Sequence, residues 1–134
     1  MLKDYLTGLP AFGIYFATAV AMVAAFGGAY SLVTRHHEFT LLRRGCAAAV
    51  PAFLGALIGY VLPLTTAMQH STNWLDFVIW ALIGAVVQIV AYLISCLIMP
   101  GLSKRISDND IAGGVLLGGM ALVFGMINSA SMTP

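Results

Sequence analysis

The sequence of 134 residues has little charge and little cysteine. Lys, Arg, Asp and Glu make up 8% of the chain, whereas an average soluble domain carries about 25%. A water-soluble protein with an apolar core and a charged surface is therefore excluded. The net charge of +1 provides no basic stripe, so we expect no binding of nucleic acid. Cys46 and Cys96 are too few for a disulfide framework.

The motifs of catalysis and metal binding are also missing. The sequence has no Ser-His-Asp arrangement, P-loop or zinc motif, so it predicts no enzymatic activity, no catalytic residue and no cofactor. His36 and His37 are adjacent and lack further ligands, so we expect no metal site. The acid nearest to a membrane interior, Asp76, lies three residues after Asn73, which is typical of a helix cap. A proton-coupled exporter would need a carboxylate at mid-membrane, and none is present.

Long apolar runs dominate the sequence instead. Hydrophobic residues make up 60% of it, and the mean hydropathy is +0.96. Runs over residues 10–33, 46–69, 74–99 and 111–132 each exceed the ~20 residues that cross a bilayer. We therefore predict an all-α integral membrane protein with four transmembrane helices in a single domain, residues 1–134. The alternative for the first run is a signal peptide cut near Ala17-Thr18-Ala19. Its long apolar core argues against this, and so does its start, where Asp4 cancels the single positive charge of Lys3.

Basic residues fall almost entirely in two loops. The loops at 34–45 and 100–110 contain Arg35, Arg43, Arg44, Lys104 and Arg105, whereas the opposite side has only Lys3. Basic loops stay in the cytoplasm. We therefore expect both loops to be cytoplasmic and both termini to be periplasmic, in a bacterial inner membrane. The basic loops could also bind anionic lipid or dock a cytosolic protein partner.

The two halves of the chain are similar in pattern. A shift of 65 residues aligns the first two helices with the last two, so that 47–50 aligns with 112–115. Each half is a helix, a basic loop and a helix. We therefore predict two parallel repeats, residues 10–69 and 74–133, related by an axis along the membrane normal.

Three segments carry a resemblance to a known family. LGALIGYVLPL (54–64), MPGLSKRISDNDIAGG (99–114) and GMINSASMT (125–133) resemble the YjfL-like bacterial inner-membrane proteins, the domain of unknown function 350 family. The resemblance extends over all four helices. It implies the location and the architecture, and it implies no activity.

Small residues recur at every fourth position of the predicted helices, a spacing that allows close approach of another helix. Gly114 and Gly118 form a GxxxG motif, a signal for dimerisation. The chain has more such faces than one four-helix bundle can use, so we predict a homo-oligomer, most simply a dimer. The candidate packing residues are Gly13, Ala17, Ala21, Ala25, Gly55, Gly59, Gly114, Gly118 and Gly125.

Polar residues within the apolar runs give a second hypothesis. Gln88, halfway along the third run, must face another helix or water, because an unpaired amide in hydrocarbon costs several kcal/mol. The leading hypothesis is a non-enzymatic membrane scaffold or partner subunit, in which Gln88 is interhelical glue. The alternative is a small channel or uncoupled permease with a polar path along Tyr60, Gln88, Tyr92 and Asn128.

Overall fold

The computed structural model describes residues 1–34 and 38–132, so the predictions for Arg35, His36 and His37 lie outside the described residues. The described part contains helices and no strand. Four helices are long and apolar enough to cross a membrane, which confirms the prediction of an all-α protein with four candidate spans. The elements are α1 (Leu2–Val33), α2 (Glu38–Arg43), α3 (Ala49–His70), α4 (Trp74–Ile98), α5 (Leu102–Ser107) and α6 (Ile111–Ser131).

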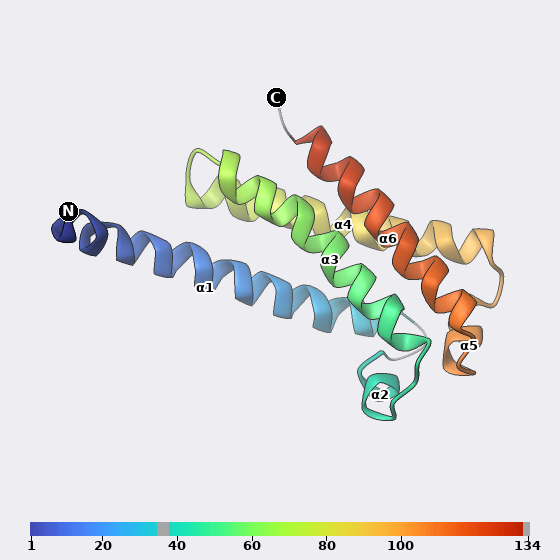
Figure 1. The fold of residues 1–134 in the computed structure, drawn as a ribbon. Coiled ribbons are helices and arrows are strands. Elements are labelled where there is room, and N and C mark those ends of the chain that lie inside the picture. The colour runs from blue at the N-terminus through green and yellow to red at the C-terminus, as the bar shows by residue number, and fades with distance from the viewer. Residues whose placement is uncertain (35–37, 133–134) are drawn as a thin grey trace.

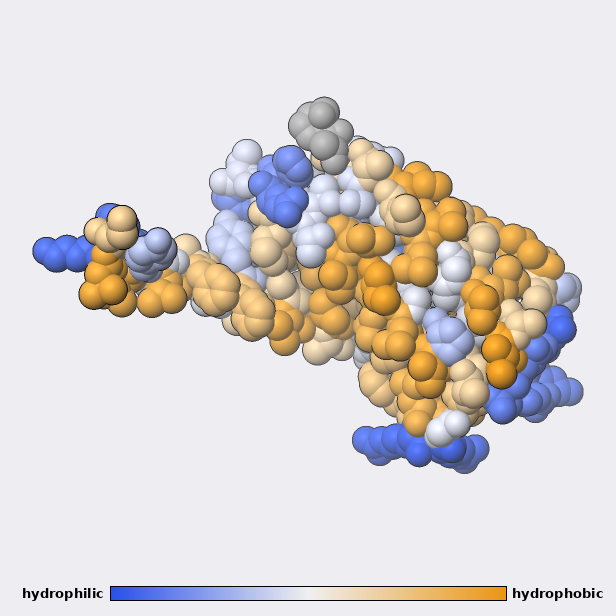
Figure 2. Space-filling model, in the orientation of Figure 1, coloured by the Kyte–Doolittle hydropathy of each residue, from blue (hydrophilic) through white to orange (hydrophobic). Residues whose placement is uncertain are grey.

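The short helices α2 and α5 lie at one end of the bundle, and Met1 and the end of α6 lie at the other (Figure 1). The long helices therefore alternate in direction along the chain. Hydrophilic residues cover α2 and α5, and a wide apolar surface separates them from the other end (Figure 2). Below, the end with α2 and α5 is called the basic end, and the opposite end is called the terminal end.

The first helix is longer than the sequence predicted. The prediction placed its start at Pro10, but α1 begins at Leu2 and includes Pro10. Proline there removes one backbone hydrogen bond to Leu6. The cost is small because this part of α1 is exposed throughout, so the freed carbonyl can meet water or lipid headgroups. A helix of this length spans about 48 Å, well beyond a hydrocarbon layer of ~30 Å.

Two contacts show how far α1 extends past its neighbours. The Tyr15 ring packs against Phe77 with centroids 5.8 Å apart, and the Trp74 indole donates to the Thr18 hydroxyl at 3.0 Å. The helices α1 and α4 run in the same direction with Tyr15 level with Phe77, so Trp74, the first residue of α4, is level with Phe12. The residues of α1 that precede Phe12 therefore project beyond α4. Figure 1 shows this N-terminal part of α1 standing clear of the other helices.

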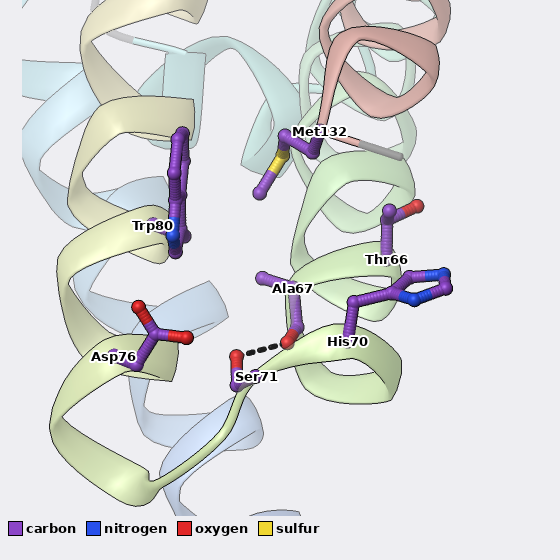
Figure 3. Close-up of a pocket in the computed structure, with 7 residues that line it drawn as sticks. All are labelled: Thr66, Ala67, His70, Ser71, Asp76, Trp80 and Met132. Carbon is purple, nitrogen blue, oxygen red and sulfur yellow. Dashed lines mark hydrogen bonds between the residues drawn. The ribbon is translucent and has the colours of Figure 1, made fainter. Parts of the chain in front are cut away.

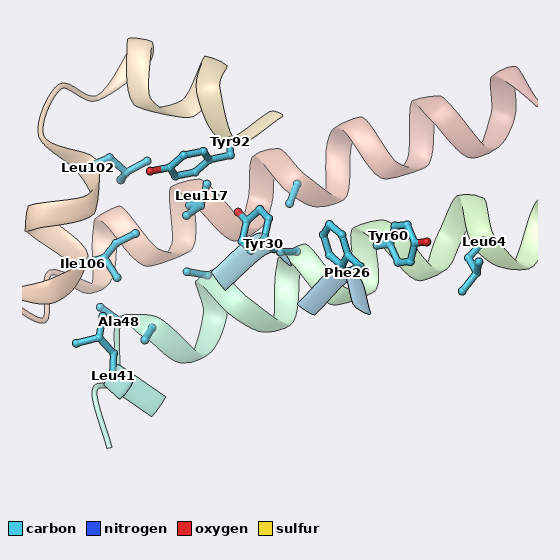
Figure 4. Packing of buried hydrophobic residues seen from close by; sticks show 14 of the residues in the cluster. Phe26, Tyr30, Leu41, Ala48, Tyr60, Leu64, Tyr92, Leu102, Ile106 and Leu117 are labelled. Atoms are coloured by element: carbon cyan, nitrogen blue, oxygen red, sulfur yellow. The ribbon is translucent and has the colours of Figure 1, made fainter. Parts of the chain in front are cut away.

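The core is built on close contact between α3 and α6. Ala48, Ala52 and Ala56 are fully buried along this contact. Aromatic rings attach α1 to it: Phe26 stacks on Tyr60 with centroids 4.3 Å apart (Figure 4). Alanine and glycine bring the two backbones together, and dispersion contacts then hold them in a solvent as apolar as leucine.

The connections follow from local sequence. Asn73 caps α4 as predicted, with its side chain accepting from the Asp76 amide at 2.8 Å. Gly45 and Asn109 both have positive φ, 75° and 63°, at the turns that precede α3 and α6. The Asn109 carboxamide accepts from the Ala48 amide at 3.0 Å, which ties the two turns of the basic end together.

Candidate functional site

Two of the four predicted polar residues, Gln88 and Tyr92, lie on one face of α4, whereas Tyr60 lies on α3 and Asn128 on α6. The buried positions of α4 recur every three or four residues, which is one helical face, and this face points toward α3 and α6. They are Phe77, Ala81, Gly84, Gln88, Ala91, Tyr92 and Ser95. The candidate path is therefore a set of polar groups inside the bundle, set among alanine and glycine.

Gln88 sits at the junction of three helices. Its side chain is 1% exposed, and its Nε2 donates to the Ala121 carbonyl of α6 at 3.1 Å. A Cβ on Gly59 of α3 would lie 3.0 Å from the same nitrogen. The other amide atom, Oε1, accepts no hydrogen bond from the described residues. The amide thus joins α4 to α6, and one of its polar atoms is left over.

Both the hydroxyl and the ring of Tyr60 contact a neighbouring helix. Its hydroxyl donates to the Ala81 carbonyl of α4 at 3.1 Å, and its ring stacks on Phe26 of α1. The side chain is 1% exposed. It therefore links α1, α3 and α4 at a single point.

Asn128 and Pro63 meet at Gly84. A Cβ on Gly84 would lie 3.5 Å from the Pro63 ring and 3.7 Å from the Asn128 nitrogen. Pro63 of α3 and Asn128 of α6 therefore both lie close to this glycine of α4. The Asn128 nitrogen is buried and donates to none of the described residues.

Tyr92 lies near the basic end, away from the other three candidates. Its hydroxyl shares a hydrogen bond of 2.9 Å with Ser103 of α5, in which either group can donate. Its ring meets Tyr30 of α1 edge to face, with centroids 6.0 Å apart. The Tyr30 hydroxyl is buried and has no partner among the described residues.

Sequence reasoning missed Glu38, a fully buried acid beside this group. Glu38 begins α2, is 0% exposed, and lies within electrostatic reach of Tyr30. The signal was the apolar segment that follows it, because Leu41 is 7% exposed and anchors α2 under the bundle. The two consecutive leucines of this loop were thus the local signal that α2 packs on the core.

Hollows lie at the two ends of this face of α4. A groove of about 520 Å³ at the basic end lies between α4 and α5 and includes Tyr92, Cys96, Ser103 and Lys104 in its lining. A pocket of about 70 Å³ at the terminal end includes Asp76 and Trp80 (Figure 3). Between the two hollows, Ala81 and Ala91 are each 1% exposed and pack against neighbouring helices.

The glycines predicted to join copies of the chain are used inside it. A Cβ on Gly118 would lie 2.2 Å from the Pro51 carbonyl, and one on Gly114 would lie 2.0 Å from the Ala48 carbonyl. Gly55, Gly59 and Gly125 have equally close contacts between α3 and α6. Within the chain these glycines pack α6 on α3, and a GxxxG contact between copies stays a prediction. The spacing shows only that a helix comes close, and here that helix is α3 of the same chain.

The small residues of α1 have a different position. Gly13, Ala17, Ala21 and Ala25 are all exposed, and a Cβ on Gly13 would meet nothing within 4 Å. At about 100° per residue, they lie opposite the face of α1 that contacts the bundle. This face is open in the single chain.

The basic residues gather as expected at one end. Arg43, Arg44 and Lys104 are exposed on or beside α2 and α5, and the Arg105 Nε is paired with Asp110 at 2.8 Å. Within residues 1–34 and 38–132 no cluster of three metal-binding side chains occurs. Cys46 and Cys96 are free thiols.

The chain is similar to one protein family over nearly its whole length. A family model described as Domain of Unknown Function (DUF350) matches residues 4–132. The UPF0719 inner membrane protein YjfL of Escherichia coli strain K12 is 39% identical over 128 residues, which cover 96% of this chain and 97% of that protein. The protein of the same name in Escherichia coli O157:H7 gives the same values. No solved structure matches the chain.

Proposed function

Because the chain belongs to the DUF350 family, together with the inner membrane protein YjfL, we propose that it is a non-enzymatic inner-membrane subunit that assembles with copies of itself through α1. One observation carries this proposal. In the apolar 18-residue stretch of α1, 6% of the residues are buried within the chain, whereas the corresponding share in the other three long helices is 33–50%. A helix that contributes so little to its own bundle is available to another.

The open face of α1 has the chemistry of a helix interface. Small residues at every fourth position allow another helix to approach closely, which is how helices associate in lipid. A face that contacts only lipid needs no small residues. The exposed residues of α4, such as Leu82 and Val86, are large. The face at Gly13, Ala17, Ala21 and Ala25 therefore fits a second copy of α1.

Cysteine crosslinking in native membranes tests this proposal. Cys46 and Cys96 are first replaced by serine, and Ala21→Cys is introduced in α1. Leu82→Cys is the matched control, because Tyr15 beside Phe77 and Tyr30 beside Tyr92 place Leu82 of α4 level with residues 20–21 of α1, and Leu82 is 55% exposed. An oxidant should produce a disulfide-linked dimer with Ala21→Cys and none with Leu82→Cys. Equal yields, or none from either, would rule out the α1 interface.

The same proposal includes the threading of the chain and its repeats. The exposed basic residues at α2 and α5 support a cytoplasmic position for this end and a periplasmic position for both termini. Two observations support a pair of parallel repeats. Both halves have a long helix, a short helix and a long helix, and α3 packs along α6 with the same direction. The basic end also suits a cytosolic protein partner or anionic lipid.

A second function, a small channel or uncoupled permease, is supported by the unpaired polar atoms. The Tyr30 hydroxyl, the Gln88 Oε1 and the Asn128 Nδ2 are buried and have no hydrogen-bond partner among the described residues. In an apolar interior each such group costs several kcal/mol unless it is hydrated. They lie between the hollows at the two ends of α4. Leakage of ions from liposomes that is abolished by Gln88→Leu would favour this function, and sealed liposomes would favour the scaffold.

A further inference from the structure

The pocket at the terminal end has a composition that neither proposed function uses. It lies where the end of α3, the start of α4 and the end of α6 come together, and its volume is about 70 Å³. This is several times the roughly 10–15 Å³ that one water requires. It is too small for a large metabolite and suits a small ion or a terminal group.

Asp76 supplies a negative charge to this pocket. Its Oδ2 accepts from the Thr72 amide at 3.2 Å, and its own amide donates to Asn73. No other hydrogen bond to the carboxylate is found among the described residues, so Oδ1 is left to a ligand. In Figure 3 the carboxylate points into the space between α4 and the end of α3.

Trp80 forms the wall one helical turn after Asp76. Figure 3 shows the indole in profile, with one face turned toward Ala67 and Met132 across the pocket. The face of an indole attracts cations, and this attraction is strongest where water is partly excluded. The Met132 thioether adds a polarizable surface on the opposite side.

The remaining groups exclude other ligands. An anion would meet the Asp76 carboxylate and no opposing cation, since the His70 ring points away from Asp76 in Figure 3. A tightly held metal ion would need more ligands than one carboxylate, and the described residues offer no cluster of three. A carboxylate and an aromatic face together are the usual partners of an ammonium group.

We propose that this pocket binds a small organic ammonium ion, with its N–H groups donating to the Asp76 Oδ1 and its charge resting on the face of Trp80. The ligand class is a primary ammonium, either a free alkylammonium or the amino end of a longer amine. The pocket opens at the terminal end, which lies outside the cytoplasm in the threading proposed above. The proposal does not depend on self-assembly through α1.

Tryptophan fluorescence tests the site directly. The chain has two tryptophans, so Trp74→Phe leaves Trp80 as the only reporter. The purified full-length variant in phosphate buffer is titrated with methylammonium chloride and, separately, with sodium chloride at equal ionic strength. Methylammonium should give a saturable change in emission that sodium does not give. Identical curves for both salts, or no saturable change, would overturn the proposal.

Two further variants separate binding from folding. In the Trp74→Phe background, Asp76→Asn keeps an acceptor for the Thr72 amide and removes the charge, so the dissociation constant should rise by about tenfold or more. Asp108→Asn, at the basic end, is the control and should leave it unchanged. Calorimetry on Trp80→Leu, which keeps the carboxylate, should also show weaker binding. Unchanged affinity in folded Asp76→Asn, judged by its thermal melt, would refute the site.

Discussion

The contact between α3 and α6 leads to a prediction that compares two adjacent glycines. Gly118 and Gly119 both lie inside α6, but a Cβ on Gly118 would be 2.2 Å from the Pro51 carbonyl, whereas one on Gly119 would meet nothing within 4 Å. The two substitutions Gly118→Ala and Gly119→Ala add the same atom to the same helix. Any difference in their stability therefore comes from the contact with α3.

The magnitude follows from the geometry. Ordinary contact begins at 3.4 Å, so α6 must retreat from Pro51 by about 1 Å to admit the methyl group. The two backbones are equally close at Gly55, the next turn of α3, where an added Cβ would lie 2.4 Å from the Gly118 Cα, so α3 leaves no room beside Gly118. Overpacking of this kind costs about 1–3 kcal/mol. Alanine in place of glycine gains up to about 1 kcal/mol of helix propensity at either site.

We therefore expect Gly119→Ala to be as stable as the wild type or slightly more stable, and Gly118→Ala to be less stable than Gly119→Ala by about 1–3 kcal/mol. The assay is reversible unfolding of the purified proteins in mixed detergent micelles, followed by far-UV circular dichroism. Size-exclusion chromatography on the same samples gives the oligomeric state. Equal stability of the two variants would refute the packing of α6 on α3. Unchanged stability with loss of the oligomer would place Gly118 between copies instead.

Further predictions concern single contacts and the threading. Asn73→Ala removes the cap of α4 and should lower the free energy of unfolding by about 0.5–2 kcal/mol. Asn109→Ala leaves the Ala48 amide without its acceptor and should lower the free energy of unfolding by about 1–3 kcal/mol. The same unfolding assay measures both. Tyr60→Phe keeps the stack on Phe26 and loses one hydrogen bond, so it should cost about 1 kcal/mol; a loss above about 3 kcal/mol would contradict its role as a single link. Cysteine at Thr7 should react in whole cells with a maleimide that cannot cross the membrane, and cysteine at Lys104 should not; the reverse would overturn the proposed topology.

The sequence was enough to locate the four long helices, but not to identify which helices pack against one another. Apolar runs of more than 20 residues marked all four long helices because hydrocarbon admits little else, and α4 and α6 end within one residue of the predicted positions. Pro10 misled the prediction because proline breaks helices buried in a core, and this part of α1 is not in one. The glycines of α6 were recognised as packing residues, but spacing along one helix carries no information about which chain supplies the other.

The candidate polar residues divide in the same way. Gln88 was predicted to join helices, and it does so through Ala121. Asn128 lies beside Gly84 with its amide nitrogen unpaired among the described residues, and its place on a polar path stays a prediction. Glu38 was missed because hydropathy over a long window treats a twelve-residue polar loop as solvated, and burial of Glu38 depends on how α2 folds under the bundle. The leucines that follow Glu38 indicate that α2 packs on the core, but which helix it meets depends on contacts between residues far apart in sequence.

The most direct test of self-assembly through α1 is the structure of the protein in a lipid nanodisc, determined by electron cryomicroscopy. We expect two or more copies in which Ala17 and Ala21 of one α1 contact the same face of another α1, while α3 and α6 stay paired within each chain. A particle with a single copy, or an oligomer in which lipid covers that face of α1, would contradict it.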